Sequence, residues 1–260
     1  MLIAPRTARQ AGRFAPMQEK KAISFAQIRS QFAPSVALWI DAQWDSTSFG
    51  STSASTKDLS NRNVSITQST SARRPLKSVV SNVASWTFDG VDDWFDTGTI
   101  NLSATQAVTI AIVEQQTNNA FSYEVDIGAS PTRFFLARRN NVASRNVSAV
   151  SFGNVGISNI WSTGAFNSAS VIVGKIDWSK PSGSEAEIFV NGTAPATATG
   201  AVNNTGNFGN QAGKIGAAAI GDGSGPYGGW IASIIVFSRA LTTAEIALLS
   251  SYLLRRAGLA

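Results

Sequence analysis

The stretch Trp86-Thr87-Phe88-Asp89-Gly90-Val91-Asp92-Asp93-Trp94-Phe95 predicts two short strands joined by a tight turn at Asp89-Gly90. Similar short apolar runs, separated by Gly, Pro, Asn, Asp and Ser, extend from it in both directions. They cover residues 36–40, 64–67, 79–80, 107–114, 121–127, 133–137, 147–152, 169–176, 186–190, 214–220 and 230–238. About a dozen short strands at this spacing indicate an all-β sandwich or barrel.

A single clear helix is predicted near the C-terminus. Thr242-Thr243-Ala244-Glu245 forms a capping box, and Ile246, Leu249 and Leu253 follow it as one apolar stripe. Arg255 and Arg256 suit the negative end of the helix dipole. We expect this helix to pack its stripe on the sandwich.

The composition excludes several kinds of chemistry. The 260 residues include no Cys and no His. Cysteine-ligated metals, thiol nucleophiles, disulfides and histidine-based triads are therefore ruled out. Charged residues make up only 14% of the chain, below the typical quarter. No run approaches the 18 or so apolar residues of a membrane helix, and we expect no signal peptide and no membrane partner.

The net charge of +5 lies entirely in residues 1–34, which hold six basic residues against Glu19. We interpret this segment as an anchoring arm ahead of one domain at 35–260. The charges are scattered without interleaved aromatic residues, so nucleic acid is not the expected partner. The basic residues of the arm are Arg6, Arg9, Arg13, Lys20, Lys21 and Arg29.

Six segments, in order, resemble the concanavalin A-like (laminin-G-type) lectin and glucanase jelly-roll family, over roughly residues 35–258. The resemblance implies an antiparallel two-sheet jelly-roll sandwich, closed by the C-terminal helix and preceded by the extended basic arm. It does not settle the function, because relatives include lectins, glycanases, adhesion modules and virion proteins. The segments lie at 36–42, 57–63, 74–76, 86–95, 188–192 and 229–242.

Glucanases of this family carry a strand motif Glu-x-Asp-x-x-Glu, which Glu124-Val125-Asp126-Ile127-Gly128-Ala129 resembles with its last carboxylate replaced by Ala129. Glu124 and Asp126 are two residues apart and are expected to share a strand face. Without the second carboxylate the acid/base is missing, so we predict no enzyme activity. Glu185 and Glu187 form another candidate pair beside a Ser/Gly turn.

Two other sets of residues are candidates for binding. Asp89, Asp92, Asp93 and Asp96 form an acidic cluster that suits calcium, the one cofactor that the sequence suggests. The alternative to a calcium site is an ordinary turn at Asp89-Gly90, with the other carboxylates solvated or paired with arginine.

The second candidate set for binding comes from the aromatic residues, which include seven tryptophans. Trp39, Trp86 and Trp230 lie inside strand patterns and are expected in the core. Aromatic rings near loops can stack on sugar rings, although packing at the rim of the core is the simpler interpretation. The candidate glycan-binding residues are Trp44, Trp161, Trp178 and Tyr227, the last at the tip of a Gly-rich loop.

Together these features favour a non-catalytic virion structural or decoration protein of a phage or phage-like particle. In this hypothesis the arm binds a capsid or other virion protein, the chain forms a symmetric homo-oligomer, and the jelly roll faces outward on the particle surface. The outward domain would bind a host-cell glycan. A free carbohydrate-binding module is the alternative, and a laminarinase-like glycanase built around Glu124 is a weaker one.

Overall fold

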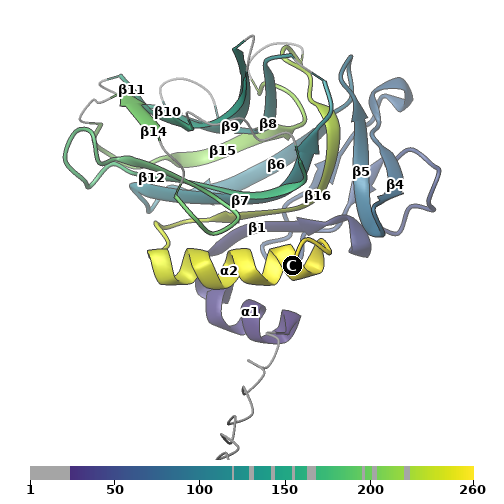
Figure 1. The fold of residues 1–260 in the computed structure, drawn as a ribbon, viewed down its shortest axis with the longest axis horizontal. Helices are drawn as coiled ribbons and strands as arrows, with labels where there is room; N and C mark the ends of the chain where they lie inside the picture. Colours follow the sequence, from purple (N-terminus) through teal and green to yellow (C-terminus); the bar gives the residue numbers. More distant parts are fainter. Residues whose placement is uncertain are drawn as a thin grey trace, which may run out of the picture.

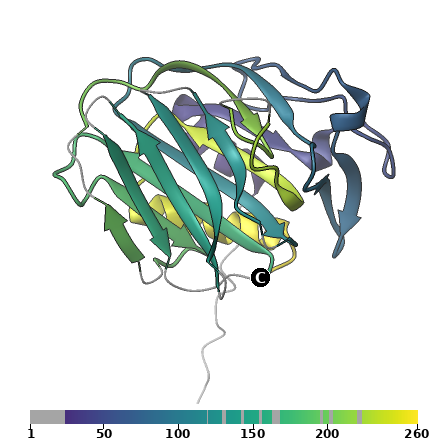
Figure 2. The same cartoon turned by 90° about the horizontal axis from the view of Figure 1, so that it is seen from above.

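The computed structural model describes residues 24–118, 120–128, 132–141, 144–153, 156–162, 168–194, 197–200, 204–219 and 223–260. Two antiparallel sheets stack face to face, and two α-helices lie beneath one of them (Figure 1). Seen from above, the strands of the upper sheet run side by side with none of the described helices across them (Figure 2). The predicted all-β two-sheet sandwich is confirmed.

One sheet has seven strands. β1 pairs with the C-terminal half of β16, alongside the segment that pairs with β5. The remaining order is β13 (Ala186–Val190), β12 (Ser170–Asp177), β7 (Ala107–Gln116), β16 (Gly228–Phe237), β5 (Val83–Asp89) and β4 (Leu76–Val80), and β1 covers Val36–Asp41.

The other sheet has nine strands. Its central strands, β8, β15 and β6, are neighbours in space but not in sequence, which is the crossed connectivity of a jelly roll. The order is β14 (Thr197–Gly200), β11 (Ile157–Ser162), β10 (Ser144–Phe152), β9 (Arg133–Asn141), β8 (Ser122–Ile127), β15 (Gly209–Ile215), β6 (Phe95–Leu102), β3 (Ile66–Thr67) and β2 (Ser55–Thr56).

Apolar side chains from both sheets fill the space between them. Trp86 of β5 meets Phe95 of β6 edge to face, with ring centroids 5.7 Å apart. Each large apolar side chain buried in this way contributes about 1.5–3 kcal/mol to folding. Trp39, Trp86 and Trp230 are all at least 96% buried, as their strand patterns predict.

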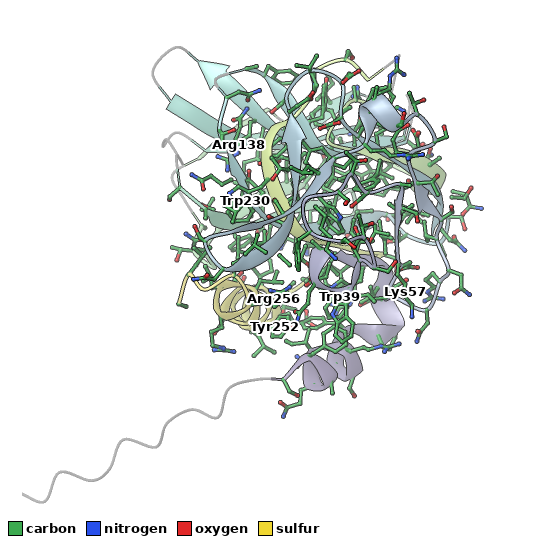
Figure 3. The ribbon with its side chains drawn as sticks, turned by 90° about the vertical axis from the view of Figure 1, so that its right-hand side faces the viewer. Trp39, Lys57, Arg138, Trp230, Tyr252 and Arg256 are labelled. Atoms are coloured by element: carbon green, nitrogen blue, oxygen red, sulfur yellow. The ribbon has the colours of Figure 1, made fainter. Side chains whose placement is uncertain are left out.

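The outer face of the seven-stranded sheet is covered by α2 (Thr243–Arg256). The capping box of Thr242 and Glu245 forms as predicted, and Ile246, Leu249 and Leu253 are buried against the strands. Arg256, near the end of the helix, donates a hydrogen bond of 2.8 Å to Asp41 of β1. Figure 3 shows Arg256 and Tyr252 on this helix, beneath the sandwich.

The same face is also covered by α1 (Phe25–Phe32), which begins with a capping box of Ser24 and Gln27. Ile28 and Phe32 are 99% buried in the cluster that α2 forms with the sheet. Ile28 and Phe32 therefore pack with the sandwich, although both lie within the segment that the sequence predicts to be an arm. Neither described α-helix is long and apolar enough to cross a membrane.

Short 3₁₀ turns complete the connections, at η1 (Ala33–Ser35), η2 (Ala42–Trp44) and η3 (Ser71–Arg73). The predicted turn at Asn191-Gly192 joins β13 to the next segment, with φ of +53° and +81° at these two residues. Two successive positive φ angles are the requirement of a type I′ turn, which explains the Asn-Gly pair.

Candidate functional site

A β-bulge in β8 decides which carboxylates face outward. The pairing of β8 with β9 shifts between Tyr123 and Val125. Val125 lies in the core between the sheets, whereas Tyr123 packs with Phe135 on the outer face. Glu124 therefore points inward and Asp126 outward. The expectation that both share a face is wrong, because the extra residue of a bulge breaks the alternation of a strand.

Inside the sandwich, Arg138 of β9 joins carboxylates from both sheets. Its guanidinium donates to Glu114 of β7 and, at 3.0 Å, to Glu124. The Tyr227 hydroxyl donates to the other oxygen of Glu114. All four side chains are fully buried, and we call them the inner cluster.

The inner cluster holds two carboxyl side chains and one guanidinium. The second carboxylate oxygen of Glu124 is buried with no hydrogen-bond partner among the described residues. Burial, and then the neighbouring carboxylate of Glu114, raise the pKa of Glu124 from 4.5 to about 8, against the opposing effect of Arg138. Burial likewise raises the pKa of Tyr227 well above 10.0.

The catalytic candidates do not form a working pair. A retaining glycosidase needs two carboxyl groups about 5–5.5 Å apart that flank the scissile bond in one cleft. Glu124 points into the core and Asp126 lies on the outer face, so they cannot share a cleft. Glu185 accepts a hydrogen bond of 2.9 Å from the backbone of Asn204. Glu187 forms an ion pair with Lys175.

On the outer face, Asp126 is held in place by Arg133 of β9. Arg133 donates from Nε at 2.8 Å and from Nη2 at 2.5 Å, a two-pronged contact. The backbone N–H of Ala219 also donates to Asp126, at 2.6 Å. Burial raises the pKa of Asp126 despite these contacts.

Next to this pair, strand register places Lys214 of β15 between Asp126 and Asp96 of β6. The Lys214 ammonium lies 2.5 Å from an oxygen of Asp96. It also sits 4.5 Å from the ring centroid of Trp94, whose indole N–H donates to Asp96 at 3.3 Å. We call Asp126, Lys214 and Asp96 the outer row.

A cavity of about 420 Å³ opens on this face, and we call it the face pocket. The side chains that line it include a carboxylate, an amide and an ammonium group, and several small residues leave the strands accessible. The lining residues are Asp96, Thr97, Gly128, Gln211, Ala212, Gly213, Lys214 and Ala219.

Two glycines in the loop before β16 let its backbone approach aromatic rings beside the outer row. A Cβ on Gly223 would lie 2.6 Å from the ring of Trp94, and one on Gly225 would lie 2.9 Å from the ring of Tyr123. Both glycines have positive φ, +82° and +60°. Tyr123 in turn contacts Phe135, at 5.1 Å between centroids. The loop thus stacks on this face, and its glycines are required there.

Of the predicted glycan-binding aromatics, Trp44 is exposed over 54% of its surface. Tyr227 is buried rather than at a loop tip: its backbone N–H donates to the carbonyl of Gly216, and its hydroxyl donates to Glu114 inside the sandwich. Trp178 is 96% buried and stacks on Phe208 at 4.0 Å. Trp161 belongs to β11 and pairs with Ser148; its side chain lies outside the described part of the structure.

The predicted acidic cluster forms in part. Asp89, Asp92 and Asp93 bring one oxygen each within 4.8 Å of one another. Burial raises the pKa of Asp93 to about 6. Asp96 is not a member, since it pairs with Lys214. Three carboxylate oxygens are fewer than the six to eight that calcium takes, so backbone or water oxygens would have to complete such a site.

No pattern in the sequence predicts that the three residues of the outer row lie side by side. Asp96, Asp126 and Lys214 lie far apart along the chain and meet only because β15 inserts between β8 and β6. Lys214 stands alone in the Gly-rich segment Gly209–Ile215. The sequence indicates only that Lys214 lies in a predicted strand.

Several solved structures share this architecture. The ligand-binding domain of botulinum neurotoxin serotype D, in complex with N-acetylneuraminic acid, matches with a TM-score of 0.60 and 10% identity over 86% of this chain and 52% of its own. Domain 4 of an extracellular arabinanase from Geobacillus stearothermophilus, in complex with arabinotriose, matches with a TM-score of 0.56 and 11% identity over 83% of this chain and 98% of its own. This chain shares the two-sheet β-sandwich fold of these domains.

A structure of botulinum neurotoxin type C, whose cell entry depends on interaction with two ganglioside molecules, matches with a TM-score of 0.58 and 12% identity over 86% of this chain and 52% of its own. This chain spans about half the length of the neurotoxin domains. At such identities the likeness concerns the fold alone. No protein-family model and no curated protein matches the sequence.

Proposed function

We propose that this chain is a non-catalytic carbohydrate-binding domain whose glycan lies in the face pocket. The observation that carries the proposal is the meeting of Asp96, Gln211 and Lys214 around a cavity of about 420 Å³. They stand on the outer face of the nine-stranded sheet, which no described helix covers.

The chemistry of these groups suits sugar hydroxyls. The carboxylate of Asp96 accepts hydrogen bonds, and the ammonium of Lys214 donates them. The side-chain oxygen of Gln211 can also accept, while its NH₂ group already donates to Thr132 and to the carbonyl of Phe208. Ala212, Gly213 and Ala219 leave room for the apolar face of a pyranose or furanose ring. A small number of placed polar groups that fix the orientation of a ligand is usual in a binding pocket. Glycan complexes of domains with this fold add support.

The test is a screen of the full chain on an array of animal, plant and bacterial glycans, followed by calorimetry on the strongest hit. Lys214→Ala and Asp96→Asn should each weaken binding at least tenfold, the effect of losing a charged hydrogen bond. Lys180→Ala removes the same charge from an exposed turn of the other sheet and should bind normally.

Two results would contradict the proposal. One is the absence of binding to any glycan on the array. The other is a glycan whose affinity survives both Lys214→Ala and Asp96→Asn but is lost on Trp44→Ala. Trp44 is exposed, and its ring centroid lies 5.9 Å from that of Phe25, so this second result would move the site to the predicted tryptophan.

The same hit tests the non-catalytic part of the proposal. Prolonged incubation with the chain should leave the bound oligosaccharide intact, as measured by release of reducing ends. Hydrolysis of the oligosaccharide by the unaltered chain, but not by Glu124→Gln, would support the glycanase alternative.

A role on a phage or phage-like particle stays a separate prediction. It depends on the basic arm, and Arg6, Arg9, Arg13, Lys20 and Lys21 lie outside the described residues. Arg29 lies in α1 and donates to Asn61 at 2.5 Å. Since α1 is part of the packed domain, the appropriate deletion is residues 2–23. It should leave a folded domain that no longer associates with particles, and unchanged association would contradict the anchoring role.

A further inference from the structure

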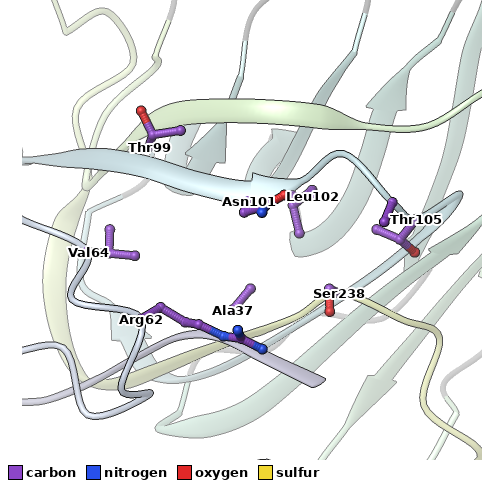
Figure 4. A pocket seen from close by; sticks show the side chains of 9 residues that line it. Ala37, Arg62, Val64, Thr99, Asn101, Leu102, Thr105 and Ser238 are labelled. Carbon is purple, nitrogen blue, oxygen red and sulfur yellow. The ribbon is translucent and has the colours of Figure 1, made fainter. Parts of the chain in front are cut away.

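A second cavity, of about 480 Å³, lies at the free edge between the two sheets, and we call it the edge pocket. It shares no lining residue with the face pocket. Figure 4 shows Asn101 and Leu102 on one wall, Arg62 and Ala37 on the opposite wall, and Thr105 and Ser238 at one end. Thr99, Val64 and Ala104 complete the lining.

The edge pocket combines apolar and polar lining residues. Leu102, Ala37 and Val64 are at least 93% buried and supply the apolar part of the lining. Arg62 is the one charged residue of the lining, and no carboxylate belongs to it. Asp58, from the same loop as Arg62, accepts backbone N–H groups of Trp39, Ser60 and Val64 and does not neutralise the arginine.

The guanidinium of Arg62 is held along one edge only. Its Nε donates to the carbonyl of Val36 at 3.4 Å, and its Nη2 donates to the carbonyl of Pro34 at 3.2 Å. Its Nη1 has no acceptor among the described residues. The edge formed by the two terminal nitrogens therefore remains available, and this edge matches the two oxygens of a carboxylate.

The opposite wall offers groups that suit hydroxyls. The Asn101 side-chain oxygen accepts from the backbone and hydroxyl of Ser103, at 3.2 and 2.8 Å. Its NH₂ group has no acceptor among the described residues and can donate to a ligand. The hydroxyl of Thr99 has no partner among the described residues and can both donate and accept.

We propose that the edge pocket binds a sugar acid, with its carboxylate on the free edge of Arg62 and its hydroxyls against Thr99 and Asn101. The apolar part of the lining would receive the C–H face of the ring. A cavity of this size falls within the range of small-molecule sites. This site does not depend on the face pocket, since neither its charge nor its lining comes from the outer row.

The experiment is a titration of the full ¹⁵N-labelled chain with sodium D-glucuronate and sodium D-galacturonate, followed by NMR, with D-glucose and D-galactose as neutral partners of the same shape. At least one uronate should bind saturably, with shift changes at residues 37, 62, 99–105 and 238. The neutral sugar should bind at least tenfold more weakly. If neither uronate binds, or if acid and neutral sugar bind equally, the proposal is wrong.

Two variants locate the carboxylate. Arg62→Gln should weaken uronate binding at least tenfold, while Arg255→Gln, an exposed arginine of α2, should not change it. Because Arg62 also holds backbone carbonyls, Asn101→Asp serves as a second variant. It keeps the size of the side chain and the acceptor for Ser103, yet repels a carboxylate, and should cause a similar loss.

Lys214→Ala separates this site from the proposed glycan site. Uronate binding should survive it unchanged. A loss of uronate binding in Lys214→Ala together with normal binding in Arg62→Gln and Asn101→Asp would place the carboxylate in the face pocket and overturn the inference.

Discussion

Two carboxylates of one strand, Glu124 and Asp126, lie in opposite surroundings. Glu124 is sealed between the sheets with Glu114, Arg138 and Tyr227. Asp126 lies on the outer face beside Arg133, next to the open face pocket. A single bulge at Glu124 separates them.

Charged side chains in this protein therefore have two separate uses. Charges of the inner cluster satisfy one another and have no route to a ligand, so their removal should alter stability. In the outer row, Lys214 and Asp96 line a cavity, so their removal should alter binding and leave stability almost unchanged. Each prediction below tests one side of this contrast.

The largest effect is expected for Arg138→Ala. The substitution leaves Glu114 and Glu124 buried without their cation, which costs about 3–5 kcal/mol when one partner of a buried ion pair is removed. Urea denaturation should show this loss. Arg255→Ala, on the exposed side of α2, is the control and should change stability by less than about 0.5 kcal/mol. A similarly small effect for Arg138→Ala would mean that the inner cluster is not structural.

The inner cluster should also make stability fall as pH rises. The pKa of Glu124 is raised from 4.5 to about 8 by burial and by Glu114, so the folded state holds a proton that the unfolded state releases. The resulting stabilisation is complete below pH 4.5 and is lost as pH rises toward 8. Melting temperatures between pH 5 and 8.5 should decline, and Glu124→Gln should flatten that decline. An unchanged slope in the variant would contradict the assignment.

A smaller effect is expected where the loop meets the outer face. Gly225 has a φ of +60°, and an alanine in this backbone conformation costs about 1–2 kcal/mol. The added Cβ of Gly225→Ala would also meet the ring of Tyr123. Gly206→Ala is the matched control, because Gly206 has φ +88° with nothing within 4 Å of the added Cβ. Both should lose stability, but only Gly225→Ala should also weaken glycan binding. Equal binding in both variants would show that this loop does not support the site.

The smallest effect on stability is expected for Lys214→Ala. Its partner Asp96 has 49% of its side chain exposed, and such a surface ion pair contributes about 0–1 kcal/mol. Thermal unfolding should therefore be nearly unchanged while glycan affinity falls. A large loss of stability would place Lys214 with the structural charges and remove the contrast.

Local signals in the sequence predict much of the fold. The capping box at Thr242 and the stripe of Ile246, Leu249 and Leu253 give α2 correctly, and the tryptophans in strand patterns are buried. Such features depend on neighbours three or four residues away.

The candidate site could not be predicted in the same way. The bulge at Glu124 depends on pairing with β9, and the outer row depends on β15 lying between two strands distant in sequence. Tyr227 stands among glycines that suggest a loop tip, yet its hydroxyl finds Glu114 inside the sandwich. Contacts between distant segments decided each of these positions.

The most direct test of the central claim is NMR mapping of the strongest array glycan on the ¹⁵N-labelled chain. We predict shift changes concentrated at residues 96–97, 126–128 and 211–214, which surround the face pocket. Changes centred on Trp44 or confined to the edge pocket, with residues 211–214 unaffected, would contradict the account.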